Sequence, residues 1–408
     1  MNCRHCGAPL ALPLIDLGSS PPSNSYLSRA ALSFPETWYP LRVAVCETCW
    51  LVQTEDFAKR DEFFSGEYAY FSSFSTSWLR HSEAYVANMT NMLGLGPQSL
   101  VVEVAANDGY LLQYVTARGI GALGVEPTAS TAAAAREKGI EIVEEFFGAE
   151  LARLLVSEGR AADLTAANNV LAHVPDINDF VAGFAILLKP NGVATFEFPH
   201  LVNLVQQHQF DTIYHEHYSY LSLTAVEHIF VANGLPVFDV EEVGTHGGSL
   251  RVYAQRADTG TRPVSPRVAA LLEAERIAGI ATPAYYTRLQ DQAETIADAL
   301  NDFLIDVRRQ GKSVAGYGAA AKGNTLLNFA GIRPHLLPWV VDRNPAKLGK
   351  FLPGSRIPVV GEERLREERP DYILILPWNL RDEVTQQLSY AREWGARFVT
   401  AIPELVVT

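Results

Sequence analysis

The clearest strand-turn-helix pattern of the chain lies in its first half. It reads Ser99-Leu100-Val101-Val102-Glu103-Val104-Ala105-Ala106-Asn107-Asp108-Gly109-Tyr110-Leu111-Leu112. The valine-rich segment 101–104 is typical of a strand that is buried on both faces of a parallel sheet. The segment 107–109 predicts a tight turn, and the helix that follows would present backbone N–H groups to a ligand. The pattern therefore predicts an α/β fold with a ligand site at the carboxyl end of this strand.

Further strands continue this pattern downstream. We expect them at 121–126, 164–169 and 192–198, the last of them after a turn at 189–192. Strands that alternate with helices predict a doubly wound, Rossmann-like sheet with its ligand at the carboxyl ends of the strands. Glu126 ends the second strand, where a carboxylate can accept hydrogen bonds from both hydroxyls of a ribose.

The first turn favours S-adenosyl-L-methionine over a dinucleotide as the ligand. It lacks the Gly-x-Gly-x-x-Gly spacing that lets a pyrophosphate approach the backbone. Glu103 and the Asn-Asp-Gly turn instead suit a cationic ligand that carries an amino group and a sulfonium. The segment 168–176 resembles a motif at the fourth strand of class I methyltransferases. The residues expected to bind this cofactor are Glu103, Asn107, Asp108, Gly109, Glu126, Pro127, Asn168 and Asn169.

Composition excludes several classes of partner. The 408 residues are too many for one core, so two or three domains are expected. The net charge of −13 argues against nucleic-acid and anionic-membrane binding. No apolar run approaches the roughly 20 residues of a membrane span, and the N-terminus has no apolar signal core. We expect a cytoplasmic protein that is a monomer or a small homo-oligomer.

The cysteines predict a zinc site. All four lie near the N-terminus, as the pairs Cys3-x-x-Cys6 and Cys46-x-x-Cys49. Each pair makes a tight turn that can place two thiolates on one ion, and two such turns complete a four-thiolate zinc site. Gly7 suits the turn after the first pair, and two unrelated buried pairs are the alternative. Since no other titratable group is placed there to act on a substrate, we expect a structural zinc.

Two polar segments have compositions typical of a reaction site. The segment 210–218 contains two histidines, two tyrosines and two carboxylates, and it nearly lacks the apolar half of a strand. Imidazoles titrate near neutral pH, a carboxylate can orient one, and phenols can hold an oxyanion. A polar corner with satisfied histidines is the alternative.

The segment 67–75 is rich in aromatic and hydroxyl groups, which predicts either core or the lid of a sugar or nucleotide pocket.

The segment 243–253 is a candidate substrate contact. Gly247 and Gly248 allow a close approach to the backbone. Arg251 follows on a strand and is a candidate donor to a phosphate or a sugar. A hairpin with a structural arginine is the alternative reading of this pattern.

The C-terminal part predicts a second α/β unit. Residues 266–311 have a helical pattern that is broken at Thr282-Pro283, and strands are expected at 312–317, 338–342, 372–377 and 397–400. Gly316-x-Gly318-x-x-Ala321 followed by Asp342 nearly satisfies an NAD fingerprint, which alone would support an oxidoreductase or epimerase of a nucleotide sugar. Lys322 in the same turn can instead bind a phosphate as a point charge. The turn's N–H groups serve either ligand.

Together these motifs resemble a known family, the sugar C-methyltransferases that methylate C-3′ of nucleotide-linked 4-ketosugars in deoxysugar biosynthesis. The resemblance covers almost the full length of the chain. It rests on the two Cys-x-x-Cys pairs and on the segments 16–24, 103–109, 169–176, 214–218, 246–251 and 316–325. The chain departs from the family at Ala105, where the family usually has glycine and where a methyl group would crowd the methionine moiety.

The resemblance implies a domain organisation and a set of roles. It implies a small zinc-binding domain at 1–90, a class I methyltransferase domain at 91–255, and a Rossmann-like domain at 265–408 that holds the nucleotide diphosphate. His217 would be the general base, with Tyr214 beside it as a hydrogen-bond donor and Glu216 as the group that orients it. His173 would be a second polar group that faces the sugar, and Tyr68 would be a lid contact. The implied substrate-binding residues are Tyr68, His246, Ser249, Arg251, Lys322 and Asn324. A non-catalytic nucleotide-sugar-binding protein is the remaining alternative.

Overall fold

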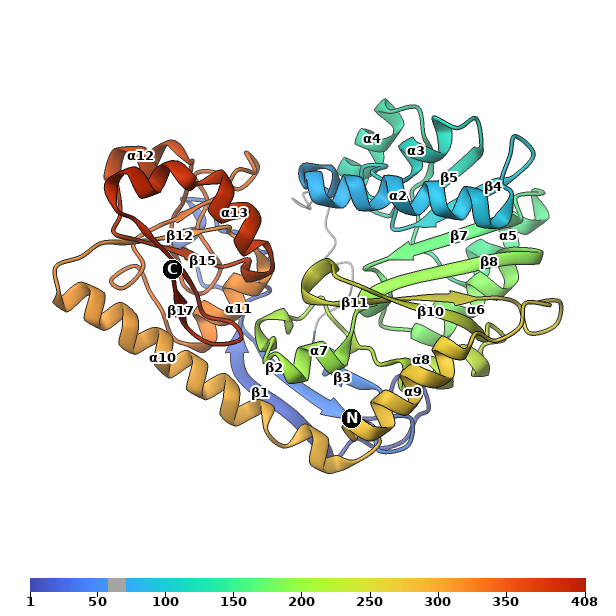
Figure 1. Cartoon of the computed structure of the whole chain (residues 1–408), viewed down its shortest axis with the longest axis horizontal. Coiled ribbons are helices and arrows are strands. Elements are labelled where there is room, and N and C mark those ends of the chain that lie inside the picture. Colours follow the sequence, from blue (N-terminus) through green and yellow to red (C-terminus); the bar gives the residue numbers. More distant parts are fainter. Residues whose placement is uncertain (58–70) are drawn as a thin grey trace.

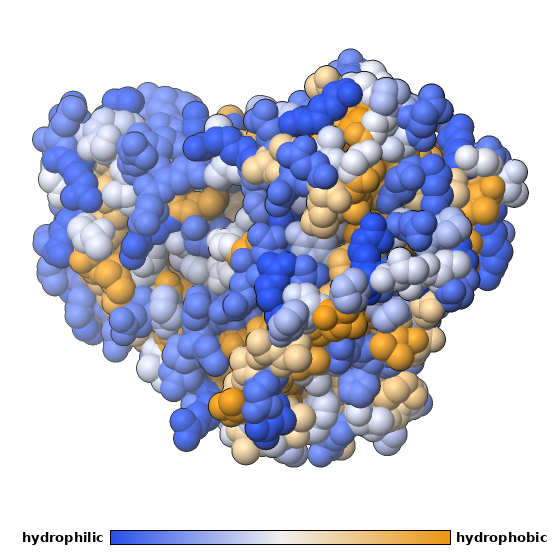
Figure 2. Space-filling model, turned by 45° about the vertical axis from the view of Figure 1, so that its right-hand side comes forward, coloured by the Kyte–Doolittle hydropathy of each residue, from blue (hydrophilic) through white to orange (hydrophobic). Residues whose placement is uncertain are grey.

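The computed structural model describes residues 1–57 and 71–408, and in this part of the chain three β-sheets are flanked by helices (Figure 1). Tyr68 therefore lies outside the described residues. Within the described ranges, no helix is long and apolar enough to cross a membrane. The face shown in Figure 2 is largely hydrophilic, with apolar residues in small groups among the polar ones. Scattered exposed apolar residues are normal for a folded protein.

The central sheet has seven strands in the order β10-β11-β8-β7-β4-β5-β6. Their bounds are β4 Leu100–Val104, β5 Gly121–Val125, β6 Glu141–Val143, β7 Ala162–Asn168, β8 Leu188–Pro199, β10 Val237–Val243 and β11 Ser249–Ala254. β11 is antiparallel to both of its neighbours, and the other pairs are parallel. The predicted doubly wound sheet is confirmed, but β6 was not predicted and the expected turn at 189–192 lies inside β8.

Helices cover both faces of this sheet (Figure 1). They are α2 Thr76–Leu93, α3 Leu112–Thr116, α4 Ala129–Glu137, α5 Ala149–Ser157, α6 Ile177–Leu187 and α8 Leu223–Ala232. α7 Leu201–Gln206 packs instead in the core that contains the N-terminal sheet. α2 begins at Ser75, whose hydroxyl accepts a hydrogen bond from the Trp78 N–H, and it ends at Gly94 with a left-handed φ of 62°. Tyr85 and Met89 on α2 join the core of the sheet.

The N-terminal sheet is completed by a distant part of the chain. Its order is β1-β2-β3-β9, with β1 Leu12–Ser20, β2 Tyr39–Val45, β3 Val52–Thr54 and β9 Ser219–Tyr220. β9 directly follows the polar segment 210–218, and it pairs antiparallel with β3 through Val52 opposite Tyr220. The polar segment is therefore held between the central sheet and the N-terminal sheet.

The C-terminal unit has a six-stranded sheet in the order β14-β13-β12-β15-β16-β17. The strands are β12 Val314–Tyr317, β13 Val340–Val341, β14 Val359–Val360, β15 Tyr372–Ile375, β16 Arg397–Thr400 and β17 Val406–Val407. Its helices are α10 Leu289–Arg309, α11 Ala321–Phe329, α12 Glu363–Glu368 and α13 Arg381–Gln387. α9 Pro266–Ala278 packs instead on α8 and β10 of the central domain, where Val268 joins the core. The predicted break between two helices at Thr282-Pro283 is confirmed. Leu14 and Leu17 of β1 share one core with Leu300 and Leu304 of α10, so the N-terminal sheet packs on this unit.

Candidate active site

The four cysteines converge on one point. Their sulfur atoms all lie within 4.8 Å of one another, although the two pairs are far apart in the sequence. Gly7 and Trp50 close the two turns with left-handed φ angles of 75° and 58°. Gly7 N–H donates to the carbonyl of the first cysteine of its pair, and Trp50 N–H does the same in the second turn. Four thiolates at this spacing are the ligand set of a closed structural zinc site.

The predicted cofactor residues gather at the carboxyl ends of β4, β5 and β7. Glu103 is fully buried, and neither carboxylate oxygen has a hydrogen bond of standard geometry among the described residues, although the Tyr110 hydroxyl is a neighbour. Burial raises the pKa of Glu103 well above its usual range, and Asp108 and Glu126 add to the rise. A buried carboxyl without a partner is unfavourable. A cationic ligand would relieve it, so the site suits the predicted cofactor.

The turn after β4 is held by the acid at the end of β5. The Asn107 N–H donates to one carboxylate oxygen of Glu126 at 2.9 Å, and the Thr128 N–H donates to the other at 2.9 Å. A Cβ at Gly109 would lie 2.3 Å from Ile140 Cδ1, so the turn requires glycine there. Ala105 has a φ of 58°, a left-handed conformation that favours glycine.

Unpartnered oxygen atoms mark the rest of this cofactor region. They are Asp108 Oδ1, Asn168 Oδ1 and Asn169 Oδ1, all buried and without a hydrogen bond to a described residue. Pro127 follows directly after Glu126. Acceptors that have no partner within the protein suit a ligand that brings its own amino and hydroxyl donors.

His217 is held in one tautomer by the backbone. Its Nδ1 lies 2.9 Å from the Thr212 carbonyl oxygen, which can only accept, so Nδ1 carries the proton and Nε2 the lone pair. The Tyr214 ring lies against it, with ring centroids 3.9 Å apart. Burial, and the repulsion that a protonated His173 would exert, hold the pKa of His217 well below its usual range. A neutral imidazole of this tautomer is a competent general base.

His173 has the same arrangement as its neighbour. Its Nδ1 donates to the backbone carbonyl of Glu216 at 2.8 Å, and the ring is edge-on to His217 with centroids 4.6 Å apart. Burial lowers the pKa of His173 to about 4. Backbone carbonyls of the segment 210–218 therefore orient both imidazoles, and the site holds two neutral histidines.

The side chain of Glu216 does not take the orienting position that we expected for it. Its Oε1 accepts from Asn24 Nδ2 at 3.2 Å, and its Oε2 is buried without a partner among the described residues. Burial raises the pKa of Glu216 to about 7. The Thr212 carbonyl holds His217 instead, because the chain turns back on itself there and brings that oxygen to Nδ1.

The second histidine of the segment points elsewhere. His215 Nε2 lies 3.3 Å from the Tyr39 carbonyl and 3.2 Å from the Pro40 carbonyl, both at the start of β2. Its ring is also edge-on to the Tyr39 ring. Because a carbonyl accepts only, Nε2 is protonated and joins the segment to the N-terminal sheet. The structure thus separates His215 from His217.

The C-terminal unit meets the segment 210–218 at an indole ring. Trp378 Nε1 donates to Asp211 Oδ2 at 2.8 Å, and the Lys322 ammonium lies 4.8 Å from the indole ring. Burial raises the pKa of Asp211 to about 6, although the positive charge of Lys322 acts in the opposite direction. Lys322 also donates to Asn379 Oδ1 at 2.8 Å. The predicted phosphate-binding lysine therefore lies next to the segment that carries the histidines.

Two other residues predicted to bind substrate have internal partners. Asn324 Nδ2 donates to the Ser23 carbonyl at 2.6 Å, and Ser249 Oγ donates to the Thr245 carbonyl at 3.0 Å. Asp342, the acid of the NAD-like fingerprint, accepts from the N–H groups of Ala319 and Asn344 at 2.8 Å. These contacts tie the glycine-rich turn and the Pro/Ser turn after β1 to the rest of the protein.

His246 lies in the loop between β10 and β11. Its ring is edge-on to Trp78 of α2, with centroids 5.1 Å apart, and its Nδ1 is buried without a partner among the described residues. Burial and the charge of Lys322 lower its pKa to about 4. A Cβ at the next residue, Gly247, would lie 2.6 Å from Trp378 Cη2, so the loop approaches the C-terminal unit closely.

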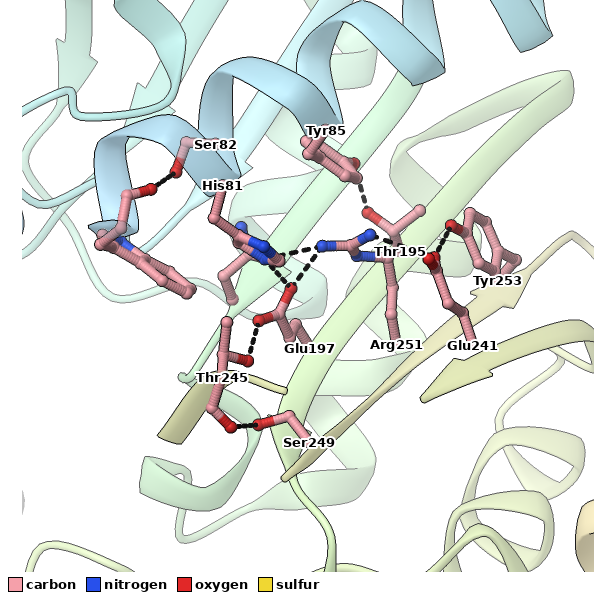
Figure 3. Close-up of polar contacts among 12 residues, drawn as sticks. His81, Ser82, Tyr85, Thr195, Glu197, Glu241, Thr245, Ser249, Arg251 and Tyr253 are labelled. Atoms are coloured by element: carbon pink, nitrogen blue, oxygen red, sulfur yellow. Dashed lines mark hydrogen bonds and ion pairs between the residues drawn. The ribbon is translucent and has the colours of Figure 1, made fainter. Parts of the chain in front are cut away.

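Arg251, another predicted substrate contact, belongs to a buried network (Figure 3). Its Nη2 donates to Glu197 Oε2 at 2.6 Å and lies 2.8 Å from His81 Nε2, and its Nη1 donates to Glu241 at 3.1 Å. His81 Nε2 also lies 2.8 Å from Glu197 Oε2, and as a donor to that carboxylate it cannot accept from Nη2 as well. The guanidinium is thus paired with two carboxylates and lies over the Tyr85 ring.

Sequence reasoning missed Glu197, His81, Thr245 and Trp378. Glu197 is fully buried in β8. Burial alone would raise its pKa, but contacts with His81 and Arg251 hold it at about 2. The signal was an acid inside the apolar run 193–198. The other three residues have no such signal, because their partners come from distant parts of the chain.

Comparisons with known proteins match the chain in three consecutive parts. Residues 3–64 match a putative zinc binding domain, residues 78–240 a methyltransferase domain, and residues 244–403 a C-methyltransferase C-terminal domain. The C-methyltransferase NovU of Streptomyces niveus is 36% identical over 403 residues, which cover 99% of this chain and 96% of NovU.

Solved structures give weaker likenesses. The PH0226 protein from Pyrococcus horikoshii OT3 is 16% identical with a TM-score of 0.38, covering 46% of this chain and 95% of its own. Magnesium protoporphyrin IX methyltransferase from Synechocystis PCC 6803, with bound SAM, is 16% identical with a TM-score of 0.34, covering 44% and 79%.

The sheet order, the polar strand ends and the matched methyltransferase domain define a class I methyltransferase that depends on S-adenosyl-L-methionine. The identity with NovU extends over nearly the whole of both proteins. The chain belongs to the C-methyltransferase family that includes NovU. Its cofactors are S-adenosyl-L-methionine and zinc, the latter at the four cysteines of the matched zinc-binding domain. These matches favour a methyltransferase over the oxidoreductase or epimerase that the NAD-like fingerprint could also have indicated.

Proposed function

We propose that this enzyme methylates C-3′ of a nucleotide-diphospho-4-keto-deoxysugar, in deoxysugar biosynthesis. The observation that carries the proposal is the pair of neutral imidazoles. His217 and His173 are buried side by side, and each Nδ1 is held by a backbone carbonyl. A substrate that must lose a proton from carbon needs such a base.

The reaction follows from the acidity of a carbon next to a ketone. The C-3–H bond breaks, its electron pair enters the enolate of the 4-keto group, and the proton goes to His217 Nε2. The Tyr214 hydroxyl is assigned to hold the enolate oxygen. His173 Nε2 is an acceptor like that of His217, so we assign it to accept a hydrogen bond from a hydroxyl of the sugar. S-adenosyl-L-methionine supplies an electrophilic methyl group when it is bound. The chain contributes alignment, through the strand ends that carry Glu103 and Glu126.

The nucleotide end of the substrate is assigned to the C-terminal unit. Lys322 supports this, because a half-buried cation beside Trp378 offers local positive charge in a protein of net charge −13. We assign sugar contacts to His246 and to Tyr68, which lies outside the described residues. In this proposal three of the predicted substrate contacts support the site through hydrogen bonds within the protein instead: Ser249, Arg251 and Asn324. In the same proposal the domains span 1–90, 91–255 and 265–408.

The test is incubation of the enzyme with S-adenosyl-L-methionine and a panel of nucleotide sugars, read by mass spectrometry. A mass gain of one methylene on 4-keto sugars but not on their 4-hydroxy analogues is expected. Because both C-3 and C-5 adjoin the ketone, NMR of the product must locate the new methyl group. Methylation at C-5, or of the 4-hydroxy analogues, would refute the assignment.

A further inference from the structure

The loop between β10 and β11 holds His246 in an unfavourable conformation. His246, Gly247 and Gly248 have φ angles of 55°, 93° and 106°, so three consecutive residues are left-handed. His246 is the one of the three with a Cβ, which this conformation disfavours. Its buried Nδ1 also lacks a hydrogen-bond partner among the described residues. Two unfavourable features at one side chain, in a well-supported loop, indicate a functional position.

Contacts from four elements hold this loop in place. Thr245 Oγ1 donates to Glu197 Oε1 of β8 at 2.7 Å. Gln209 Nε2, just before the segment 210–218, donates to the Gly247 carbonyl at 2.9 Å. The His200 N–H donates to the Gly248 carbonyl at 3.0 Å, and Trp378 packs against Gly247 from the C-terminal unit. The imidazole itself packs edge-on against Trp78 of α2, and its Nδ1 is left without a hydrogen-bond partner among the described residues.

Glu197 is a fixed anchor for the loop. Its other carboxylate oxygen is paired with Arg251, and its backbone carbonyl accepts from the Asn169 N–H at 2.7 Å. Asn169 is one of the predicted cofactor residues. In Figure 3 the Thr245 side chain points directly at Glu197, on the side away from Arg251. The Thr245 hydroxyl thus links a buried ion pair to the backbone that carries His246.

We propose that Thr245 and Glu197 are positioning residues, which hold the strained loop so that the His246 imidazole meets a hydroxyl of the acceptor sugar. The inference rests on the proposed function, in which His246 binds that sugar. A sugar hydroxyl both donates and accepts, so it satisfies the unpartnered Nδ1 in either tautomer. Without the Thr245 hydroxyl, the loop loses its side-chain bond to the anchor and His246 can relax out of the left-handed region.

The first test needs no substrate. Thr245→Val removes the hydroxyl at nearly constant volume, and Thr245→Ser keeps it. Thr295→Val makes the same change at an exposed position on α10. With labelled histidine and the His246 imidazole signal assigned by His246→Ala, we expect Thr245→Val to shift that signal and the other two variants to leave it in place. An unshifted signal in Thr245→Val would overturn the inference, whatever the substrate is.

The second test is a double-mutant cycle on methyl transfer to the 4-keto sugar panel. Thr245→Val should lower kcat/KM for the acceptor about tenfold, the loss of a hydrogen bond to a charged group, with unchanged affinity for S-adenosylhomocysteine. In a His246→Ala background it should have no further effect. A second tenfold loss of kcat/KM in the His246→Ala background would show that Thr245 acts through a residue other than His246. If no acceptor is methylated while the NMR shift is present, the proposed substrate fails and the positioning stands.

Discussion

Replacing Glu216 by glutamine should stabilise the protein at high pH. The Glu216 carboxyl is buried, one oxygen accepts from Asn24, and the other has no partner among the described residues. Glutamine keeps an acceptor for Asn24 and removes the charge. Active sites often hold such unfavourable groups, and their removal raises stability at the expense of activity.

The magnitude follows from the pKa. Burial raises it from 4.5 to about 7 in the folded protein. Each tenfold change corresponds to about 1.4 kcal/mol, so the buried carboxylate costs about 3 kcal/mol once it is ionised. Because the folded state binds this proton more tightly, the cost is absent below pH 4.5, grows as pH rises to 7, and is complete above it. The glutamine amide adds unpaired donors, but that cost does not depend on pH.

The assay is urea unfolding of wild type and Glu216→Gln at pH 5 and pH 8.5. The stability difference between the two proteins should move by about 2–3 kcal/mol in favour of the variant as pH rises. Glu393→Gln, at an exposed position, controls for the loss of one negative charge. A difference that stays constant with pH would show that Glu216 is not a buried, poorly paired carboxyl. The variant should also lose methyl transfer.

Three further predictions test other parts of the structure. Cys46→Ser should lower bound zinc, measured by mass spectrometry of the metal, and unfolding should become easier in step with activity; a selective loss of kcat would contradict a structural metal. Glu275→Ala should lower the free energy of unfolding by about 3–5 kcal/mol, since Glu275 accepts from His200 and from two N–H groups at the start of α8. The acid limb of the pH dependence of kcat/KM should lie below pH 6.5, because burial lowers the pKa of His217; a limb above that value would contradict a neutral base.

Local signals made the parallel strands predictable. Leu100 to Val104 are apolar except for Glu103, and the central sheet has its strand there. β6 spans only Glu141–Val143, too short for a run to stand out. β9 has only two residues. It joins the N-terminal sheet by pairing with β3, which lies far from it in the sequence. Sequence periodicity contains no information on such pairings.

The candidate site was predictable by residue type but not by partner. The segment 210–218 was recognised from its composition, and the structure pairs His217 with His173 there. The group that orients His217 is a backbone carbonyl, which every residue carries and no pattern reveals. For the same reason the two histidines of this segment, two residues apart, could not be separated from spacing. Only the fold shows that His215 faces β2.

The most direct test of the account is hydrogen exchange at the sugar. With S-adenosylhomocysteine bound, methyl transfer cannot occur, yet wild type in D₂O should exchange the C-3 hydrogen of a nucleotide-diphospho-4-keto-deoxysugar, as followed by NMR. His217→Ala should abolish the exchange and bind S-adenosylhomocysteine as tightly as wild type does, whereas His215→Ala should retain exchange in its folded fraction. Exchange that persists at the wild-type rate in His217→Ala would contradict His217 as the base.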